Sequence, residues 1–242
     1  MPYADYFLMG SLGAQKCREM LARNHLLAEK ICAPEFRIEP FEQLQQWQLN
    51  RLADSYRDLS SQDSMRPACE FFLSELYGGL DFLERDQDMH KVMPLMEKFL
   101  PGKALMSLAS AFELQAISLE FDMDMARILN SRGVVDLDVP TYGTVYRACG
   151  RQAEREKQIL LIRQIGIDLA DLVGKTLLTA LVRLLRGPAH AAGFGTLQEF
   201  LESGLVSFRK MDDPVFFIDT VYQREWASMQ KLFAGDENPF RL

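Results

Sequence analysis

The hydrophobic residues of this chain recur at helical spacing almost throughout. Between Phe41 and Leu59, for example, they return every three to five residues, which places them along one face of a helix. No run alternates between hydrophobic and polar residues for long enough to indicate a β-strand. The pattern therefore predicts an all-α fold, a compact multi-helix bundle of about seven to nine helices.

The longest uninterrupted helical pattern runs over residues 102–131. At 1.5 Å per residue such a helix is about 45 Å long, which suits the central helix of a bundle. Asp213 followed by Pro214 is a signal that starts the last helix. Because no long linker interrupts these patterns, we expect a single all-helical domain over residues 1–242, with residues 1–35 as an N-terminal helical arm packed on the bundle.

The composition is that of an ordinary globular protein, with 48% hydrophobic and 25% charged residues. The net charge of −7 repels phosphate polymers, so nucleic acid is not an expected partner. The longest apolar region, residues 159–185, contains charged residues that are costly at a bilayer centre, so we expect no membrane span. The four cysteines have neither paired spacing nor neighbouring histidines, which is typical of reduced thiols and predicts a cytoplasmic protein.

Sequence motifs for nucleotide binding and for the serine nucleophile are absent from the chain. It contains no Gly-x-Gly-x-x-Gly, no Gly-x-x-x-x-Gly-Lys-Ser/Thr and no Gly-x-Ser-x-Gly. These absences argue against Rossmann, P-loop and α/β-hydrolase activities, and we expect no cofactor.

Two pairs of metal-ligating side chains stand one helical turn apart, Asp86 with His90 and His25 with Glu29. Facing helices can assemble a metal centre from such residues, so the alternative function is a metal-dependent helical oxidase, ferritin-like with two irons or similar to the haem oxygenases. The Glu-x-x-His spacing of ferritin-like sites is missing, and surface ion pairs are the favoured explanation. His190 is the best placed histidine for haem, although a tight turn is the favoured explanation of its setting.

Three arginines, Arg147, Arg151 and Arg155, recur every four residues and form a basic stripe if one helix carries them. Such a stripe could hold a phosphate group or an acidic partner. Glu154 and Glu156 interleave with it and would neutralise part of its charge, and Gly150 is a residue at which the face can break. The favoured interpretation is therefore a solvated face with salt bridges.

The most polar helix junction lies in the stretch FFLSELYGGLDFLERDQDMH, residues 71–90. We expect a polar cluster here, with these members: Glu75, Tyr77, Asp81, Arg85, Asp86 and Arg51. A network at the helix ends explains these residues without a ligand, and this structural interpretation is favoured. In the functional alternative they line a polar pocket, completed by Gln48 beside Arg51.

The same stretch, with VMPLMEKFLP after it, resembles a family of uncharacterised bacterial proteins in which Phe-Phe-x-x-Asp/Glu-Leu-Tyr-Gly, an Arg-Asp pair and a Leu-Pro follow one another. The segments WQLNRLADSYRDL and GPAHAAGFGTLQEFLESGLVSF are similar to other parts of that family, so the resemblance covers most of the chain from about residue 36. The family is a domain of unknown function. The resemblance implies an all-helical cytoplasmic protein and supplies no activity, cofactor or catalytic residue.

The leading hypothesis is a cytoplasmic, non-enzymatic helical protein that forms a homodimer and binds a partner or a small apolar ligand between its helices. It follows from the many amphipathic helices and from the lack of a complete catalytic constellation. Several of the twelve methionines lie near aromatic residues, and such a core can adapt to an apolar ligand. Catalytic residues stay unassigned.

Overall fold

The computed structural model describes residues 2–73, 93–94, 96–98, 100–173 and 195–241. These residues form α-helices joined by loops, and they include no β-strand. The all-α prediction is therefore confirmed. No helix in this part of the chain combines the length and the apolar composition that crossing a membrane requires.

The central helix starts directly after Pro101 and runs over thirty residues, which are the bounds that the sequence predicts. In chain order the helices are α1 (Pro2–Cys32), α2 (Ile38–Ser55), α3 (Arg57–Ser60), α4 (Arg66–Phe71), α6 (Gly102–Ser131), α7 (Val139–Cys149), α8 (Gln152–Val173), α10 (Gly195–Arg209) and α11 (Pro214–Ala234).

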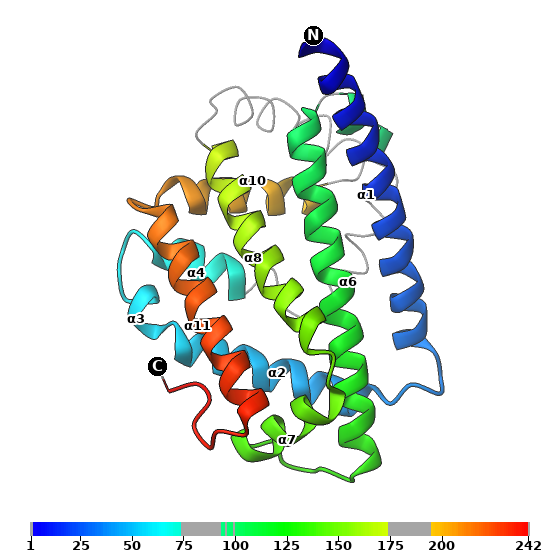
Figure 1. Cartoon of the computed structure of the whole chain (residues 1–242), viewed down its shortest axis with the longest axis vertical. Coiled ribbons are helices and arrows are strands. Elements are labelled where there is room, and N and C mark those ends of the chain that lie inside the picture. Colours follow the sequence, from blue (N-terminus) through cyan, green and yellow to red (C-terminus); the bar gives the residue numbers. More distant parts are fainter. Residues whose placement is uncertain (1, 74–92, 95, 99, 174–194, 242) are drawn as a thin grey trace.

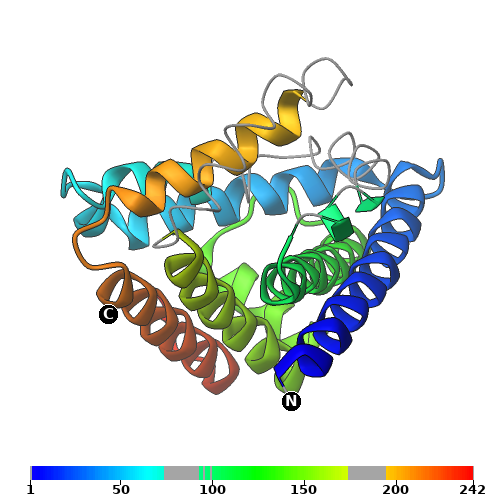
Figure 2. The same cartoon turned by 90° about the horizontal axis from the view of Figure 1, so that it is seen from above.

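Four long helices lie side by side in the order α11, α8, α6 and α1 and form one layer of the molecule (Figure 1, Figure 2). Helices α2 and α10 cross behind this layer, and α7 lies at its lower end in the view of Figure 1. The central position of α6 follows from its neighbours, since it contacts α1, α2, α7 and α8.

Capping side chains fix the starts of α7 and α11. Asp138 caps α7, because its carboxylate accepts a hydrogen bond from the backbone N–H of Thr141 at 2.9 Å. Asp213 caps α11 in the same way through the backbone N–H of Phe216 at 2.9 Å. The predicted start of the last helix is therefore confirmed.

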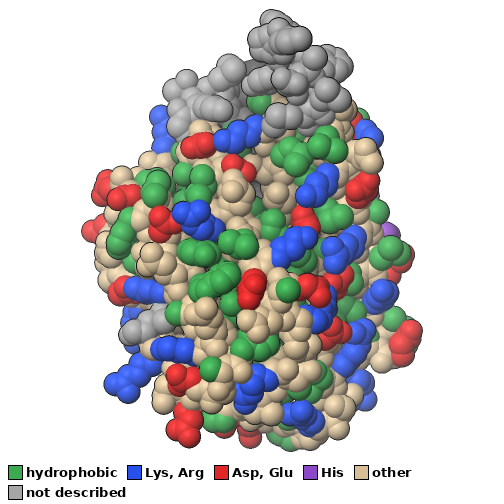
Figure 3. Space-filling view, in the orientation of Figure 1, with side chains coloured by type: hydrophobic (Ala, Val, Ile, Leu, Met, Phe, Trp, Pro, Cys, Tyr) green, Lys and Arg blue, Asp and Glu red, His purple; other side chains and the backbone are tan. Residues whose placement is uncertain are grey.

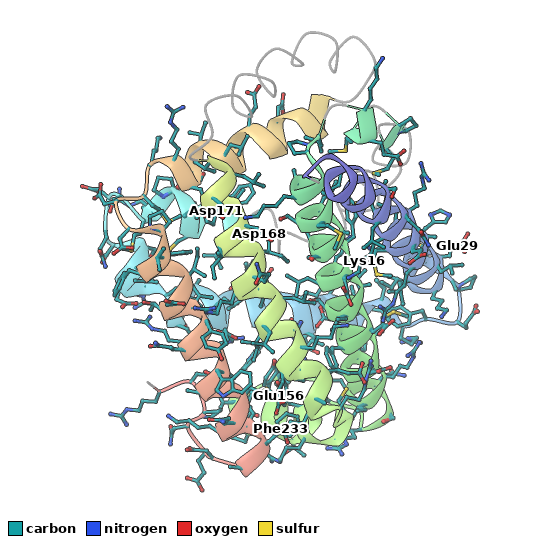
Figure 4. The ribbon with its side chains drawn as sticks, turned by 45° about the horizontal axis from the view of Figure 1, so that its top comes forward. Lys16, Glu29, Glu156, Asp168, Asp171 and Phe233 are labelled. Carbon is teal, nitrogen blue, oxygen red and sulfur yellow. The ribbon has the colours of Figure 1, made fainter. Side chains whose placement is uncertain are left out.

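Polar contacts fasten α1 to α6 beside an apolar seam. The buried side chain of Asn24 donates a hydrogen bond to the carbonyl oxygen of Phe112 at 3.1 Å. Lys16, labelled in Figure 4, forms an ion pair with the buried Glu113 at 3.1 Å. Because buried polar groups need hydrogen-bond partners, these contacts fix the position of α1 along the axis of α6.

A matched pair of glycine substitutions tests the packing of α8 on α11. A β-carbon at Gly166 would lie 2.9 Å from Cγ1 of Ile218, whereas the nearest atom to one at Gly143 would be Nη1 of Arg147 at 3.4 Å. Both residues are helical, so alanine gains about 0.5 to 1 kcal/mol of helix stability at either position. We expect Gly143→Ala to be neutral or stabilising, and Gly166→Ala to be about 1 to 3 kcal/mol less stable because of the clash. Denaturant unfolding measures both, and equal stabilities would contradict the close approach.

Candidate functional site

Most of the predicted polar cluster cannot be placed. Glu75, Tyr77, Asp81, Arg85 and Asp86 all lie outside the described residues. Arg51 is described, and its guanidinium pairs with a residue of α11, Glu225. A polar site at Arg51 therefore has to be built from other helices.

Of the two metal-ligand pairs that the sequence predicts, one lies in the described residues. Asp86 and His90 lie outside the described residues, as does His190. Nε2 of His25 lies 3.5 Å from Oε1 of Glu29, and both side chains are more than half exposed on α1. Glu29 lies on the side of α1 that faces away from α6 (Figure 4). In the described part of the chain, no group of three His, Cys, Asp or Glu side chains is arranged to hold a metal ion.

The basic stripe does not exist as one surface. Gly150 and Arg151 have positive φ angles of 64° and 61°, so the chain changes direction between α7 and α8 and the three arginines separate. Arg147 donates a hydrogen bond to the carbonyl oxygen of Leu232 at 2.9 Å. Arg155 is only 5% exposed, so the prediction of a solvated face is wrong for this residue.

Arg151 does have the salt bridges that the sequence predicted. Its guanidinium binds Glu120 at 3.3 Å, Asp124 at 3.0 Å and also Glu154. Acidic and basic side chains are likewise mixed over the face of the molecule shown in Figure 3. This mixing favours a solvated surface over a basic patch for an acidic partner.

A small polar cavity lies where α2, α6, α7, α8 and α11 meet. Its volume is about 70 Å³. The polar and charged side chains around it are Gln48, Arg51, Ser118, Asp122, Tyr142, Tyr146, Arg155, Gln158, Glu225 and Ser228. Glu156 and Phe233, labelled in Figure 4, directly follow the lining residues Arg155 and Leu232 and mark this end of the bundle.

The first arginine of the cavity is partly buried, and its charge is paired with a carboxylate. Arg51 binds Glu225 with two hydrogen bonds, from Nη1 to Oε1 at 2.6 Å and from Nη2 to Oε2 at 3.2 Å. The hydroxyl of Tyr56 donates to the same carboxylate at 2.8 Å. This bidentate pair connects α2 with α11 and gives Arg51 a counter-charge, while its Nε, like that of Arg155, is buried without a hydrogen bond.

The second buried arginine, Arg155, lacks such a partner. Its Cζ lies 3.6 Å from the ring centroid of Phe121 and 4.3 Å from that of Tyr146. Its Nη atoms contact a neutral amide and a thioether, Gln158 Oε1 at 3.4 Å and Met125 Sδ at 3.2 Å. The guanidinium also forms a hydrogen bond with the thiol group of Cys149. Among the described residues no acidic side chain forms an ion pair with Arg155, and its buried Nε makes no hydrogen bond. The guanidinium is therefore desolvated, covered by two rings and short of acceptors.

Asp122 is the remaining charged group of the cavity. Two amides donate to its carboxylate, Gln48 Nε2 to Oδ1 at 3.2 Å and Gln45 Nε2 to Oδ2 at 3.4 Å. Burial raises the pKa of Asp122 to about 6, because desolvation outweighs the hydrogen bond from Gln48 and the charge of Arg155. Asp122 therefore carries a negative charge at neutral pH and loses it under mildly acidic conditions.

Two tyrosine hydroxyls complete the polar lining. Tyr142 stacks on Trp47 with ring centroids 4.2 Å apart. Burial raises the pKa of Tyr142 and of Tyr146, although the positive charges of Arg51 and Arg155 act in the opposite direction. Both hydroxyls stay protonated, so they are donors and acceptors without charge.

The cavity was only partly visible in the sequence. The sequence predicts Arg51 and Gln48 as members of a polar pocket and Arg155 as a residue able to hold a phosphate. It does not point to Asp122 or Glu225. Asp122 and Ser118 are four residues apart and share one face of α6. Two polar residues beside the apolar stripe are therefore the sequence feature that indicates a polar site at this position.

The family model for a domain of unknown function, DUF8198, matches residues 34–239 of the chain. The matched range begins after α1 and includes the four charged residues of the cavity, Arg51, Asp122, Arg155 and Glu225. Comparisons with curated proteins and with solved structures found no match.

Breaking the Arg51–Glu225 pair should be costly. We expect Glu225→Gln to lower the free energy of unfolding by about 3 kcal/mol, because it leaves a buried guanidinium without its counter-charge. The double variant Arg51→Met, Glu225→Leu should lose less than this, since it removes both charges. Denaturant unfolding of the wild type and the two variants gives the comparison, and a double variant at least as unstable as Glu225→Gln would contradict it.

Asp122 should make stability depend on pH. Its pKa is raised on folding, so the folded state binds the proton more tightly, and this stabilisation is lost as the pH rises from about 4 through 6. In a buffer free of carboxylates and oxyanions, the stability of Asp122→Asn relative to wild type should therefore increase between about pH 4 and pH 8, by on the order of 2 kcal/mol. Urea unfolding at a series of pH values measures the difference. A difference that stays constant with pH would show that Asp122 is not desolvated.

Proposed function

We propose that this chain, which belongs to the DUF8198 family, is a helical binding module whose cavity holds a small anionic group. The ligand carries a carboxylate or a comparable oxyanion, and Arg155 binds it. The single observation that supports this function is a buried guanidinium that has no acidic partner in the described part of the chain.

An unpaired buried cation is expensive. Removing a charge from water costs several kcal/mol unless another group compensates it, and proteins rarely bury an arginine without a partner. The rings of Phe121 and Tyr146 compensate part of this cost through cation–π contacts. The charge of Asp122 compensates a further part, although Asp122 forms no ion pair with Arg155. A bound anion would supply the hydrogen-bond acceptors that the guanidinium lacks, so the arrangement favours binding over a purely structural role.

The shape of the site limits the ligand. Two rings cover the guanidinium, so an anion reaches it along its N–H edge, where the free Nε lies. That edge matches the geometry of two oxygen atoms in a carboxylate or phosphate. At about 70 Å³ the cavity has less than half the volume of a cavity of about 150 Å³ that holds benzene. The bound group is therefore as small as acetate or sulfate, or it is the acidic end of a longer molecule.

This proposal replaces the apolar ligand expected from the sequence, since the lining of the cavity is rich in hydrogen-bonding groups. The non-enzymatic binding function is kept. A homodimer and a cytoplasmic location also stay predictions, and light scattering after size-exclusion chromatography would test the first. A metal-dependent oxidase has no support among the described residues, because they contain no cluster of metal ligands.

Side-chain NMR tests the function directly. We expect the Nε–Hε signal of Arg155 to move during titration with sodium acetate or sodium sulfate and to saturate, because Nε gains an acceptor. Arg163 is the matched internal control on the same helix, since its Nε already donates to Asp219 at 2.9 Å. Its signal should stay in place, and sodium chloride at equal ionic strength should move neither signal.

Variants of the two arginines provide the second test. Arg155→Lys should weaken the binding of the responding anion at least tenfold, because lysine lacks the planar fork, whereas Arg163→Lys should leave it unchanged. In the variant proteins, anion binding is measured from the chemical shifts of the backbone amides of α8 during the same titration. An Arg155 signal that stays fixed at about 100 mM acetate and about 100 mM sulfate, where even millimolar binding is saturated, would refute the function.

A further inference from the structure

We infer that the cavity takes up its anion together with one proton, which Asp122 holds, so that the net ligand is an acid. This inference rests on the proposed function and defines its regulation, since anion binding then depends on pH. It follows from the balance of charges around the cavity.

The cavity is electrically neutral before an anion enters. Its described lining contains two cations, Arg51 and Arg155, and two carboxylates, Asp122 and Glu225. One cation is already held by two hydrogen bonds in the Arg51–Glu225 pair. An entering anion and the ionised Asp122 would therefore share Arg155 within a cavity of about 70 Å³. Like charges this close in a desolvated site cannot both persist, so one of them is protonated.

Asp122 is the carboxylate that accepts the proton. The oxygen atoms of Glu225 are already occupied, because they accept two hydrogen bonds from a guanidinium and one from Tyr56. Asp122 receives hydrogen bonds only from the neutral amides of Gln45 and Gln48. Burial already raises the pKa of Asp122 to about 6, and a neighbouring anion raises it further.

The titratable groups that face Asp122 come from each of the surrounding helices that line the cavity. They are Arg51 on α2, Tyr142 and Tyr146 on α7, Arg155 on α8 and Glu225 on α11. The tyrosines stay neutral at neutral pH, because burial raises their pKa values. On α1, Arg23 forms an ion pair with Glu120, two residues before Asp122 on α6. Asp122 is therefore a group of the described lining whose raised pKa brings a change of charge close to neutral pH.

The proton balance of the step is simple. The free protein with ionised Asp122 takes one anion and one proton from solution, and the complex contains the anion beside a neutral carboxylic acid. No covalent bond in the ligand is made or broken, and no electrons are transferred. The neutral Asp122 gains an O–H donor, which can point to an oxygen atom of the bound anion.

The test measures the dissociation constant of acetate or sulfate, whichever moves the Arg155 signal, at several pH values between about 6 and 8. Both probes stay ionised over this range, so the change of affinity with pH reflects protonation of the protein and not of the probe. We expect affinity in the wild-type protein to fall about tenfold per pH unit, which corresponds to uptake of one proton. In Asp122→Asn the affinity should no longer change with pH, and at about pH 8 it should exceed the wild-type affinity at least tenfold.

Asp124→Asn is the matched control. This residue lies two positions further along α6, and its carboxylate contacts Arg127 and Arg151 instead of the cavity. The control should keep the wild-type pH dependence, and circular dichroism verifies that both variants are folded. If wild type binds the anion with an affinity independent of pH, or if Asp122→Asn keeps the slope, the proton linkage is refuted while the anion site stands. If no anion moves the Arg155 signal at any pH, the proposed function itself fails.

Discussion

The burial of two arginines at one helix junction is the constraint on which the rest of the structure depends. Arg51 and Glu225 join α2 to α11, and Arg155 brings together a ring from α6 and a ring from α7. Apolar packing alone tolerates small shifts between helices, whereas a buried charge tolerates few positions. The junction therefore fixes the relative placement of five helices and concentrates the polar groups at one end of the bundle. The seam between α1 and α6 carries the more ordinary apolar packing.

A cavity of this kind is difficult to reconcile with optimisation for stability alone. An unpaired guanidinium and a desolvated carboxylate both oppose folding, and a well-packed apolar core of the same volume would avoid both costs. Proteins commonly keep such local costs where a ligand compensates them. The small volume of the cavity also explains the choice of an aromatic cover, because Phe121 and Tyr146 stabilise the cation without occupying its N–H edge.

Local sequence signals predicted the helices well and the site poorly. The apolar period and Pro101 predicted α6 with its observed bounds, and the Asp213 cap predicted the start of α11, because these signals act over one or two turns. The burial of Arg155 could not be predicted in this way. Counting in steps of four joined it to Arg147 and Arg151, whereas the positive φ angle at Arg151 separates them. Glu225 was missed because its partner is 174 residues away in the chain, and helical spacing contains no information about such distant pairs.

The turn formed by Gly150 and Arg151 also has a consequence for how the site forms during folding. It places Tyr146 and Arg155, only nine positions apart in the chain, in direct contact across the α7–α8 hairpin. Loop closure over so short a distance costs little entropy, so the arginine and one of its rings can meet early. The second ring comes from α6, and the ion pair between α2 and α11 joins residues 174 positions apart in the chain. The Arg155 side of the cavity is thus local in sequence, whereas its Arg51 side depends on contacts between distant segments.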